Sequence, residues 1–250
     1  MGKEVRSPGR LPLYYLEEWG ARHGVVAGIT GRGTEPGRGF DLGLWADTPA
    51  GEAMSRWQAF RQSFPGFTSF ALGHQVHGAR VAYLDGGEGW IQLDGVDGWV
   101  TVSPGIMLTV TVADCVPVYL LVPGRGIALL HAGWRGTAAG ILPAGLTRLT
   151  QATGSAPADV VMHCGIGICG CCYEVGSEVM TSCGVVPVGD GPHHLDLRRR
   201  LAEEAEALGV RDPSISPWCS AHDHSLFFSH RASGGVDGRM VAFLGLPPTD

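Results

Sequence analysis

The sequence is short of charge and has no long apolar run. Only 17% of its 250 residues are charged, and 24 acidic residues outnumber 18 basic ones, for a net charge of −6. No apolar stretch approaches the roughly 18 residues of a membrane-spanning helix. The one basic cluster, residues 198–200, is followed by Glu203 and Glu204, which indicates one face of a solvated helix. We therefore expect neither a membrane protein nor a nucleic-acid-binding protein.

The N-terminus also lacks the apolar core of a signal peptide. Residues 1–10, MGKEVRSPGR, are polar and are expected to be flexible. Seven cysteines without a secretion signal favour reduced thiols over a disulfide framework, so we expect a cytoplasmic protein. With 44% hydrophobic residues and neither a repeat nor a linker, residues 11–250 are predicted to form a single domain.

Apolar runs bounded by glycine and proline dominate the chain and predict strands. The clearest cover residues 106–112, 116–122 and 127–130, and weaker ones cover 23–30, 81–85, 225–231 and 239–246. Helices are predicted over residues 52–64, 137–150 and 197–208, and from about Tyr173, whereas residues 86–98 resemble a loop. Because strands outnumber helices and do not alternate with them as βαβ units, the pattern favours an α+β fold with a mixed sheet.

Polar residues interrupt or end the three clearest strands. Asp114 and Cys115 stand between two apolar runs, and His131 ends the third. Such side chains are costly to bury unless they have partners. His77, in the earlier segment HQVHG, completes a set of two histidines and one cysteine scattered along the chain, which is typical of an open catalytic zinc site. The alternative is that Cys115 is a small buried apolar residue and the histidines are hydrogen-bonded core groups.

Other polar residues surround this set. Asp114 or Gln75 could orient the imidazoles by hydrogen bonds. Arg135 stands between Gly133 and Gly136 before a predicted helix, so its guanidinium and nearby backbone N–H groups form a candidate phosphate site.

Four cysteines cluster at positions 164, 169, 171 and 172, and a His-x-His pair lies at 222 and 224. Grouped together, the cysteines match no common metal spacing, so we interpret them as small residues that pack tightly. The histidine pair is interpreted as a solvated loop.

Four motifs in order resemble one family over nearly the whole chain. QVHG begins at Gln75, ADCVPV at Ala113, HAGWRG at His131 and CCYEVG at Cys171. Together they are similar to the YfiH-like laccase-domain family, whose members are also named multicopper polyphenol oxidase and peptidoglycan editing factor. The resemblance implies a mixed β-sandwich flanked by helices, related to the catalytic fold of cytotoxic necrotizing factor.

The resemblance also implies a zinc enzyme that acts on purine nucleosides. Family members phosphorolyse adenosine, inosine, guanosine and methylthioadenosine, and can deaminate adenosine. Their zinc ligands correspond to His77, Cys115 and His131. A family arginine corresponds to Arg56, which becomes the first candidate for binding phosphate, with Arg135 the second. The loop GIGICGCCYEV departs from the family pattern by losing two prolines and gaining Cys169, which leaves the substrate preference open.

Three rival interpretations remain. A copper polyphenol oxidase would need type 1 and trinuclear copper ligands, which the sequence does not supply. A cysteine hydrolase or amidase in peptidoglycan editing would use Cys115 as the nucleophile and His77 or His131 as the base. A non-enzymatic binding module would leave the metal residues without a purpose. No specific protein partner is inferred.

Overall fold

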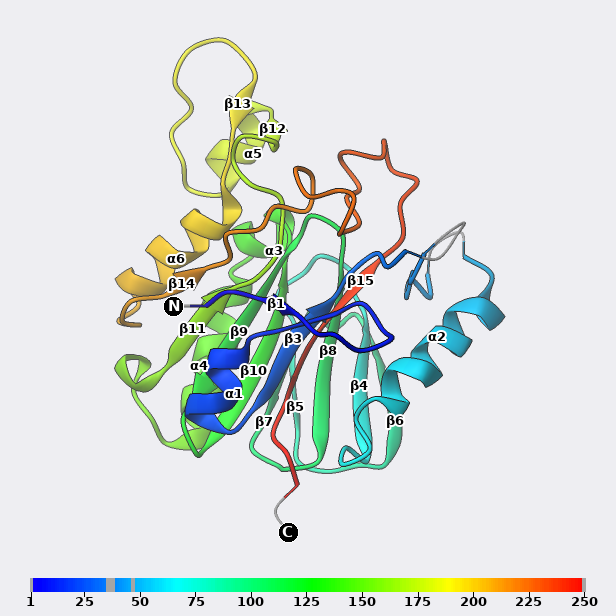
Figure 1. The fold of residues 1–250 in the computed structure, drawn as a ribbon. Coiled ribbons are helices and arrows are strands. Elements are labelled where there is room, and N and C mark those ends of the chain that lie inside the picture. The colour runs from blue at the N-terminus through cyan, green and yellow to red at the C-terminus, as the bar shows by residue number, and fades with distance from the viewer. Residues whose placement is uncertain (1, 35–38, 46–47, 249–250) are drawn as a thin grey trace.

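The computed structural model describes residues 2–34, 39–45 and 48–248, which form two large β-sheets packed face to face (Figure 1). The first sheet has seven strands in the order β1–β2–β3–β15–β8–β4–β6. β4 runs parallel to β6 and β8, and the other neighbours are antiparallel. The bounds are β1 Val5–Arg6, β2 Leu13–Tyr15, β3 Val26–Thr30, β15 Met240–Gly245, β8 Ile106–Val112, β4 Ser69–His74 and β6 Gly89–Asp94.

The second sheet has six strands in the order β14–β11–β9–β10–β7–β5. The pairs β5–β7 and β11–β14 are parallel, and the rest are antiparallel, so both large sheets are mixed, as predicted. A separate small sheet pairs β12 with β13. The bounds are β14 Ser214–Ile215, β11 Val161–Cys164, β9 Val116–Val122, β10 Gly126–Ala132, β7 Gly98–Thr101, β5 Val81–Leu84, β12 Glu174–Val175 and β13 His193–His194.

The central strands are continuous apolar runs because both of their faces are covered. In β15, Met240, Ala242 and Leu244 enter the core between the two sheets, whereas Val241 and Phe243 face the outer layer formed by α2 (Ala50–Gln62). Successive residues of a strand point to opposite faces, so a strand buried on both sides needs apolar residues throughout. The same alternation in β10 directs His131 toward the layer between the sheets, on the side of Ile127 and Leu129.

Helices cover the two outer faces of the sandwich. Trp57 and Phe60 of α2 pack on the seven-stranded sheet, while Leu146 of α4 and Leu201 of α6 belong to the cluster on the six-stranded sheet. No described helix is long and apolar enough to cross a membrane. The bounds are α1 Glu17–His23, α2 Ala50–Gln62, α3 Trp134–Ala138, α4 Ile141–Thr153, α5 Ser177–Ser182 and α6 Leu197–Ala207, with a 3₁₀ turn at Pro157–Asp159.

Several local predictions are confirmed. The helix expected over residues 52–64 is α2, and the one over 197–208 is α6, whose first turn is capped by the Asp196 carboxylate. The helix expected over 137–150 is present in two pieces, because Gly140 adopts a positive φ of 84° between α3 and α4. Pro143 lies in the first turn of α4, where a proline is tolerated.

Other local predictions are wrong. Residues 86–98 contain strand β6 and not only a loop, and no helix begins at Tyr173, because β12 precedes α5. Residues 225–231 form turns and irregular backbone instead of a strand. The segment 1–10 was expected to be flexible, but it contains β1 and the fully buried Glu4, whose carboxylate contacts His163 and Ser216.

Candidate active site and metal centre

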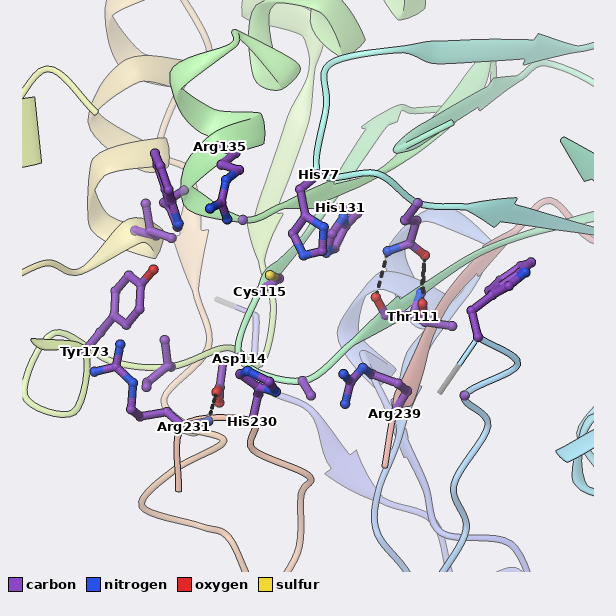
Figure 2. A pocket seen from close by; sticks show the side chains of 18 of the residues that line it. His77, Thr111, Asp114, Cys115, His131, Arg135, Tyr173, His230, Arg231 and Arg239 are labelled. Atoms are coloured by element: carbon purple, nitrogen blue, oxygen red, sulfur yellow. Dashed lines mark hydrogen bonds between the residues drawn. The ribbon is translucent and has the colours of Figure 1, made fainter. Parts of the chain in front are cut away.

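His77, Cys115 and His131 meet at one end of the sandwich, as their positions beside strands predict (Figure 2). His131 lies near the end of β10, Cys115 directly precedes β9, and His77 follows β4. Their donor atoms all lie within 4.8 Å of one another. The left-handed turns that deliver them require positive φ, 60° at His77 and 84° at Asp114. Two sheets and three distant segments thus converge on one small volume.

Asp97, which the sequence analysis overlooked, holds two of these residues in place. Its fully buried carboxylate accepts hydrogen bonds from His131 Nδ1 at 2.9 Å and from the backbone N of His77 at 2.9 Å. The backbone N–H groups of Gly78 and Val76 donate to its other oxygen, at 2.8 and 3.2 Å. One carboxylate therefore fixes both the ring of His131 and the turn that carries His77. Ligating histidines commonly have such a carboxylate partner.

Cys115 and His131 perturb each other's protonation. Burial raises the pKa of the Cys115 thiol, but the neighbouring His131 and His77 lower it by more, so that the pKa falls to about 6. Burial lowers the pKa of His131, whereas Cys115 and Asp97 raise it, to about 9. A thiolate beside an imidazolium is the resulting state at neutral pH.

The donor set suits a divalent metal of borderline softness. A thiolate and two imidazoles are the ligand types that zinc takes in catalytic sites, with one position left open. His131 would release its proton when its second ring nitrogen binds the metal, while Nδ1 keeps its bond to Asp97. The residues present therefore fit a bound metal ion.

The three residues lie in a pocket of about 590 Å³, within the usual size of a small-molecule site. Three arginines line it: Arg135, Arg231 and Arg239. The guanidinium of Arg135 stacks over Trp134 at 4.3 Å, and that of Arg231 over Tyr173 at 5.1 Å. The pocket thus combines soft metal donors with cationic and aromatic walls (Figure 2).

The remaining predicted site residues take different positions. Gln75 lines the pocket, but its amide pairs with the backbone and hydroxyl of Thr111. Asp114 also lines it, and its carboxylate accepts from Ser220 Oγ at 2.6 Å and from the backbone N of Arg231 at 2.7 Å. The role of orienting an imidazole, which the sequence suggested for Gln75 or Asp114, thus belongs to Asp97.

Arg56 is not among the residues that line the pocket. Its guanidinium donates to the carbonyl oxygen of Asp41 and pairs with Glu52 at 3.3 Å. Arg231 and Arg239 line the pocket instead, and they come from the loop between β14 and β15. The sequence analysis assigned no role to these two arginines, because they reach the pocket only through the fold.

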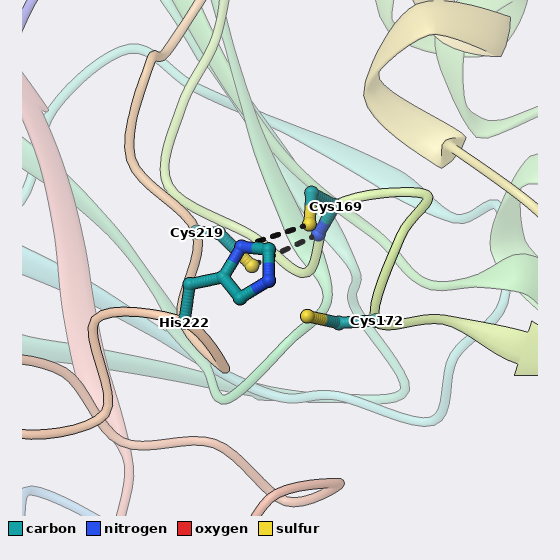
Figure 3. Close-up of side chains that lie close together, drawn as sticks. All are labelled: Cys169, Cys172, Cys219 and His222. Atoms are coloured by element: carbon teal, nitrogen blue, oxygen red, sulfur yellow. Dashed lines mark hydrogen bonds between the residues drawn. The ribbon is translucent and has the colours of Figure 1, made fainter.

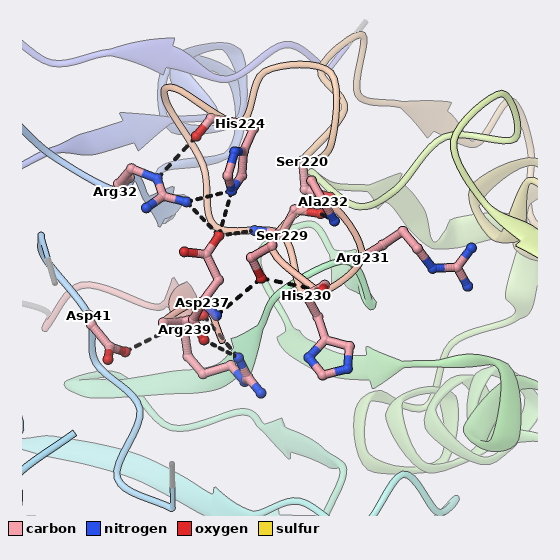
Figure 4. A network of polar contacts seen from close by, with 12 residues as sticks. Arg32, Asp41, Ser220, His224, Ser229, His230, Arg231, Ala232, Asp237 and Arg239 are labelled. Atoms are coloured by element: carbon pink, nitrogen blue, oxygen red, sulfur yellow. Dashed lines mark hydrogen bonds and ion pairs between the residues drawn. The ribbon is translucent and has the colours of Figure 1, made fainter. Parts of the chain in front are cut away.

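Carboxylates hold this loop against the rest of the protein (Figure 4). Asp237 accepts from Arg32 at 2.5 Å and from the backbone N of Ser229 at 2.9 Å, and it contacts His224. Asp41 accepts from the backbone N of Arg239 at 2.7 Å. The chain around Arg231 and Arg239 is therefore anchored to Arg32 and to Asp41.

Fold and site together define a class of protein, a two-sheet sandwich with a His/Cys/His centre and an arginine-lined pocket at the strand ends. The chain belongs to the family described as multi-copper polyphenol oxidoreductase laccase, whose model matches residues 22–247. The resemblance to the YfiH-like laccase domain is thereby confirmed.

Relatives with known names or structures cover almost the whole chain. A Deinococcus radiodurans protein named purine nucleoside phosphorylase is 33% identical, over 97% of this chain and 96% of its own length. A protein of an unknown prokaryotic organism named adenosine deaminase RL5 is 32% identical, over 86% of this chain and 92% of its own. The crystal structure of the Bacillus licheniformis hypothetical protein YfiH superposes with a TM-score of 0.87 at 27% identity, and covers 97% of this chain and 98% of that one.

Proposed function

We propose that this protein is a purine nucleoside phosphorylase, which uses phosphate to cleave adenosine, inosine, guanosine or methylthioadenosine. The observation that carries the proposal is one pocket that holds the His77–Cys115–His131 centre and three arginines. An anionic co-substrate needs such cationic side chains, and a purine base needs apolar and aromatic walls. The name of the Deinococcus radiodurans relative supports the same activity.

The arginines of the pocket would bind the phosphate. Of the two arginines that the sequence proposed for this role, Arg135 lies in the pocket, whereas Arg56 lies outside its lining. Arg231 and Arg239 add two further guanidinium groups. A guanidinium can donate two parallel hydrogen bonds to a phosphate, which fixes the orientation of the anion as well as its position.

The reaction exchanges one bond to the sugar for another. A phosphate oxygen attacks the anomeric carbon, and the bond from that carbon to the purine nitrogen breaks. The electron pair of that bond leaves with the base, which takes up a proton, so the products are ribose 1-phosphate and the free purine. Tyr173 stays a phenol and can donate a hydrogen bond, because burial above all raises its pKa, to about 12.

His77, Cys115 and His131 would hold zinc in this pocket, as the resemblance implies. A zinc ion there would supply a Lewis acid and lower the pKa of bound water. The chain's own contribution is to fix the three donors, through Asp97 and through the close approach of Gly133, where an added Cβ would lie 2.9 Å from Cys115 Sγ.

Adenosine deamination in the same pocket is a second candidate, favoured by the likeness to adenosine deaminase RL5. In that reaction water replaces the amino group at the purine C6 and ammonia leaves, so no phosphate is consumed. Copper is the alternative metal, but the single His-x-His pair does not form one site. His222 lies near Cys169, while His224 contacts Arg32 and Asp237.

A cysteine hydrolase, the rival suggested by the implied kinship with cytotoxic necrotizing factor, keeps one favourable observation. A Cys–His–Asp nucleophilic site needs a histidine that contacts the cysteine on one side and a carboxylate on the other. His131 contacts Cys115 and Asp97 in this way. This activity would require the cysteine to be free of metal.

The deciding experiment incubates zinc-loaded protein with adenosine, with and without phosphate, and separates the products by chromatography. Adenine and ribose 1-phosphate that appear only with phosphate would establish phosphorolysis, whereas inosine formed without phosphate would establish deamination. No product from zinc-loaded protein would refute both.

Two arginine variants then locate the phosphate. Arg135→Ala should raise the KM for phosphate at least tenfold, the loss expected for a charge-assisted contact of about 1.5–3 kcal/mol. Arg56→Ala, outside the pocket, serves as the matched control and should leave that KM unchanged. The reverse result would return the role to Arg56.

A further inference from the structure

A second group of metal-binding side chains lies outside the pocket centre (Figure 3). Cys169, Cys172, Cys219 and His222 each offer one donor atom, and the four atoms lie within 4.8 Å of one another. Read in these pairs, the sequence is C-x₂-C at 169–172 and C-x₂-H at 219–222. The interpretation of the 164–172 cysteines as mere packing residues, and of His222 as a solvated loop histidine, missed this pairing because the two halves are far apart in sequence.

Each pair lies on its own hydrogen-bonded turn. The backbone N of Cys172 donates to the carbonyl oxygen of Cys169 at 3.0 Å. The backbone N of Asp223 donates to the carbonyl oxygen of Cys219 at 2.8 Å, and the Asp223 carboxylate accepts from the N of Cys219 at 3.0 Å. Each turn therefore holds the two side chains of its pair on the same side, as two-ligand turns of zinc sites do.

The backbone also joins the two turns to each other. Gly167 and Cys219 form a parallel β-bridge, and the N of Ser220 donates to the carbonyl oxygen of Gly167 at 3.1 Å. The backbone N of Cys169 donates to Cys219 Sγ at 3.2 Å, and Cys169 Sγ lies 3.5 Å from His222 Nδ1. An N–H group directed at a sulfur stabilises the thiolate that a metal needs.

A buried cation stands beside the cluster. Arg198, 6% exposed, donates to the carbonyl oxygen of Trp218, the residue before Cys219, at 2.8 Å. Burial lowers the pKa of Arg198, but Asp196, and after it the charges of Cys219 and Cys169, raise it above its ordinary value. Three thiolates and a divalent cation leave one excess negative charge, and the positive charge of Arg198, which is also ion-paired with Asp196 at 2.9 Å, lies close enough to interact with it.

We propose that Cys169, Cys172, Cys219 and His222 bind a structural zinc ion. Tetrahedral zinc with bonds of about 2.3 Å to sulfur holds its ligand atoms roughly 3.8 Å apart. The ligand atoms, which lie within 4.8 Å of one another, would therefore move closer by about an ångström through side-chain rotation when zinc binds. Because the protein supplies all four ligands, the site has no position for substrate and differs in kind from the three-ligand centre in the pocket.

The proposed zinc would stabilise the walls of that pocket. It ties the loop before Tyr173 to the segment that continues into Ser220, His230 and Arg231. Tyr173, His230 and Arg231 line the pocket, and Ser220 donates to Asp114. The two-ligand turns thus clamp two long loops whose other ends form the substrate site.

Metal analysis of the purified reduced protein tests the proposal. Wild-type protein should carry two zinc ions per chain. Cys172→Ser and Cys219→Ser should each lose one, while His131→Ala loses the other. Cys171→Ser is the matched control, since Cys171 is an exposed neighbour outside the cluster, and it should retain both.

A second measurement on the wild type does not depend on how the variants fold. Alkylation followed by peptide mass spectrometry should find Cys169, Cys172 and Cys219 protected in zinc-loaded protein and modified after chelation, with Cys171 modified in both states. Equal modification with and without zinc would overturn the proposal. A disulfide between two of the three cysteines in the protein as purified, or copper or iron in place of the second zinc ion, would overturn it as well.

Discussion

Replacing Asp97 by Asn keeps the shape of the side chain but places an amide donor where a carboxylate oxygen accepts two hydrogen bonds. One oxygen receives His131 Nδ1 and the N of His77, and the other receives the N of Val76 and of Gly78. Either orientation of the amide therefore sets two donors against a donor. A buried donor left without a partner costs about 1–3 kcal/mol, so two cost about 2–6 kcal/mol.

The expected loss lies in the lower part of this range, because Val76 and His77 are exposed and water can reach their backbone N–H groups. We expect Asp97→Asn to reduce the free energy of unfolding by about 2–4 kcal/mol, measured by urea denaturation in the presence of chelator. Zinc affinity at the pocket centre should fall about 10–100-fold, as for other lost carboxylate partners of ligating histidines.

Asp94→Asn provides the matched control, since the Asp94 side chain is 85% exposed and its Oδ1 lies 3.6 Å from His74 Nδ1. It should change the free energy of unfolding by no more than about 0.5 kcal/mol. An Asp97→Asn protein as stable as this control, with unchanged zinc affinity, would refute the role assigned to Asp97.

Wild type and Asp97→Asn should also respond differently to acid, because the pKa of Asp97 differs between the folded and unfolded states. Burial raises the pKa of Asp97, but the hydrogen bonds from His131, Gly78 and Val76 lower it below its ordinary value overall. A depressed pKa contributes stability that is present above the unfolded value of about 3.9 and is lost as the pH falls through the folded value. The stability difference between wild type and Asp97→Asn should therefore shrink below about pH 4. It should also shrink as the pH rises toward 9, because Asp97 helps to raise the pKa of His131 and that contribution is lost as His131 deprotonates.

Three further predictions concern the site and the sandwich. In metal-free protein, alkylation of Cys115 should show an inflection near its pKa of about 6, and His131→Ala should move it toward the ordinary thiol value of about 8.5; an unchanged profile would contradict the thiolate–imidazolium pair. Gly133→Ala should weaken zinc binding without removing a ligand, because the new Cβ would lie 2.9 Å from Cys115 Sγ, whereas Gly51→Ala, with open space around it, should not affect zinc. Tyr119→Phe removes a buried hydroxyl that donates to the carbonyl oxygen of Gly28 at 2.8 Å and should cost about 1–3 kcal/mol in thermal or urea unfolding, against less than about 0.5 kcal/mol for the half-buried Tyr83→Phe.

The residues of the metal centre could be predicted from the sequence because they interrupt or end strong apolar runs. Cys115 and His131 flank β9 and β10, whose burial on both faces makes the runs continuous and the polar residues conspicuous. Asp97 escaped notice because it stands between glycines in a stretch that resembles a loop. Its importance comes from four hydrogen bonds, three of them to the backbone of a turn more than a dozen residues earlier.

Features that depend on contacts between distant parts of the sequence could not be predicted from the sequence. Residues 225–231 have a strand-like composition, but Asp237 and Asp114 bind the backbone N–H groups of Ser229 and Arg231, which a strand would have used for its ladder. The C-x₂-C and C-x₂-H pairs stand about 50 residues apart in the sequence, and the fold brings them together through the bridge between Gly167 and Cys219 and the contacts of Cys169 with Cys219 and His222.

Asp97 also has a mechanical consequence, because the turn it holds follows β4 of the seven-stranded sheet, while His131 belongs to β10 of the six-stranded one. The centre therefore lies where the two sheets meet, and a buried apolar layer packs between them. A shift of one sheet relative to the other would change the distance between His77 and His131 without breaking the hydrogen bonds within either sheet. The spacing of the donor atoms thus depends on how well that apolar layer is filled. A substitution deep in the layer, such as Leu129→Ala, would therefore change the distances between the metal-binding atoms in the pocket.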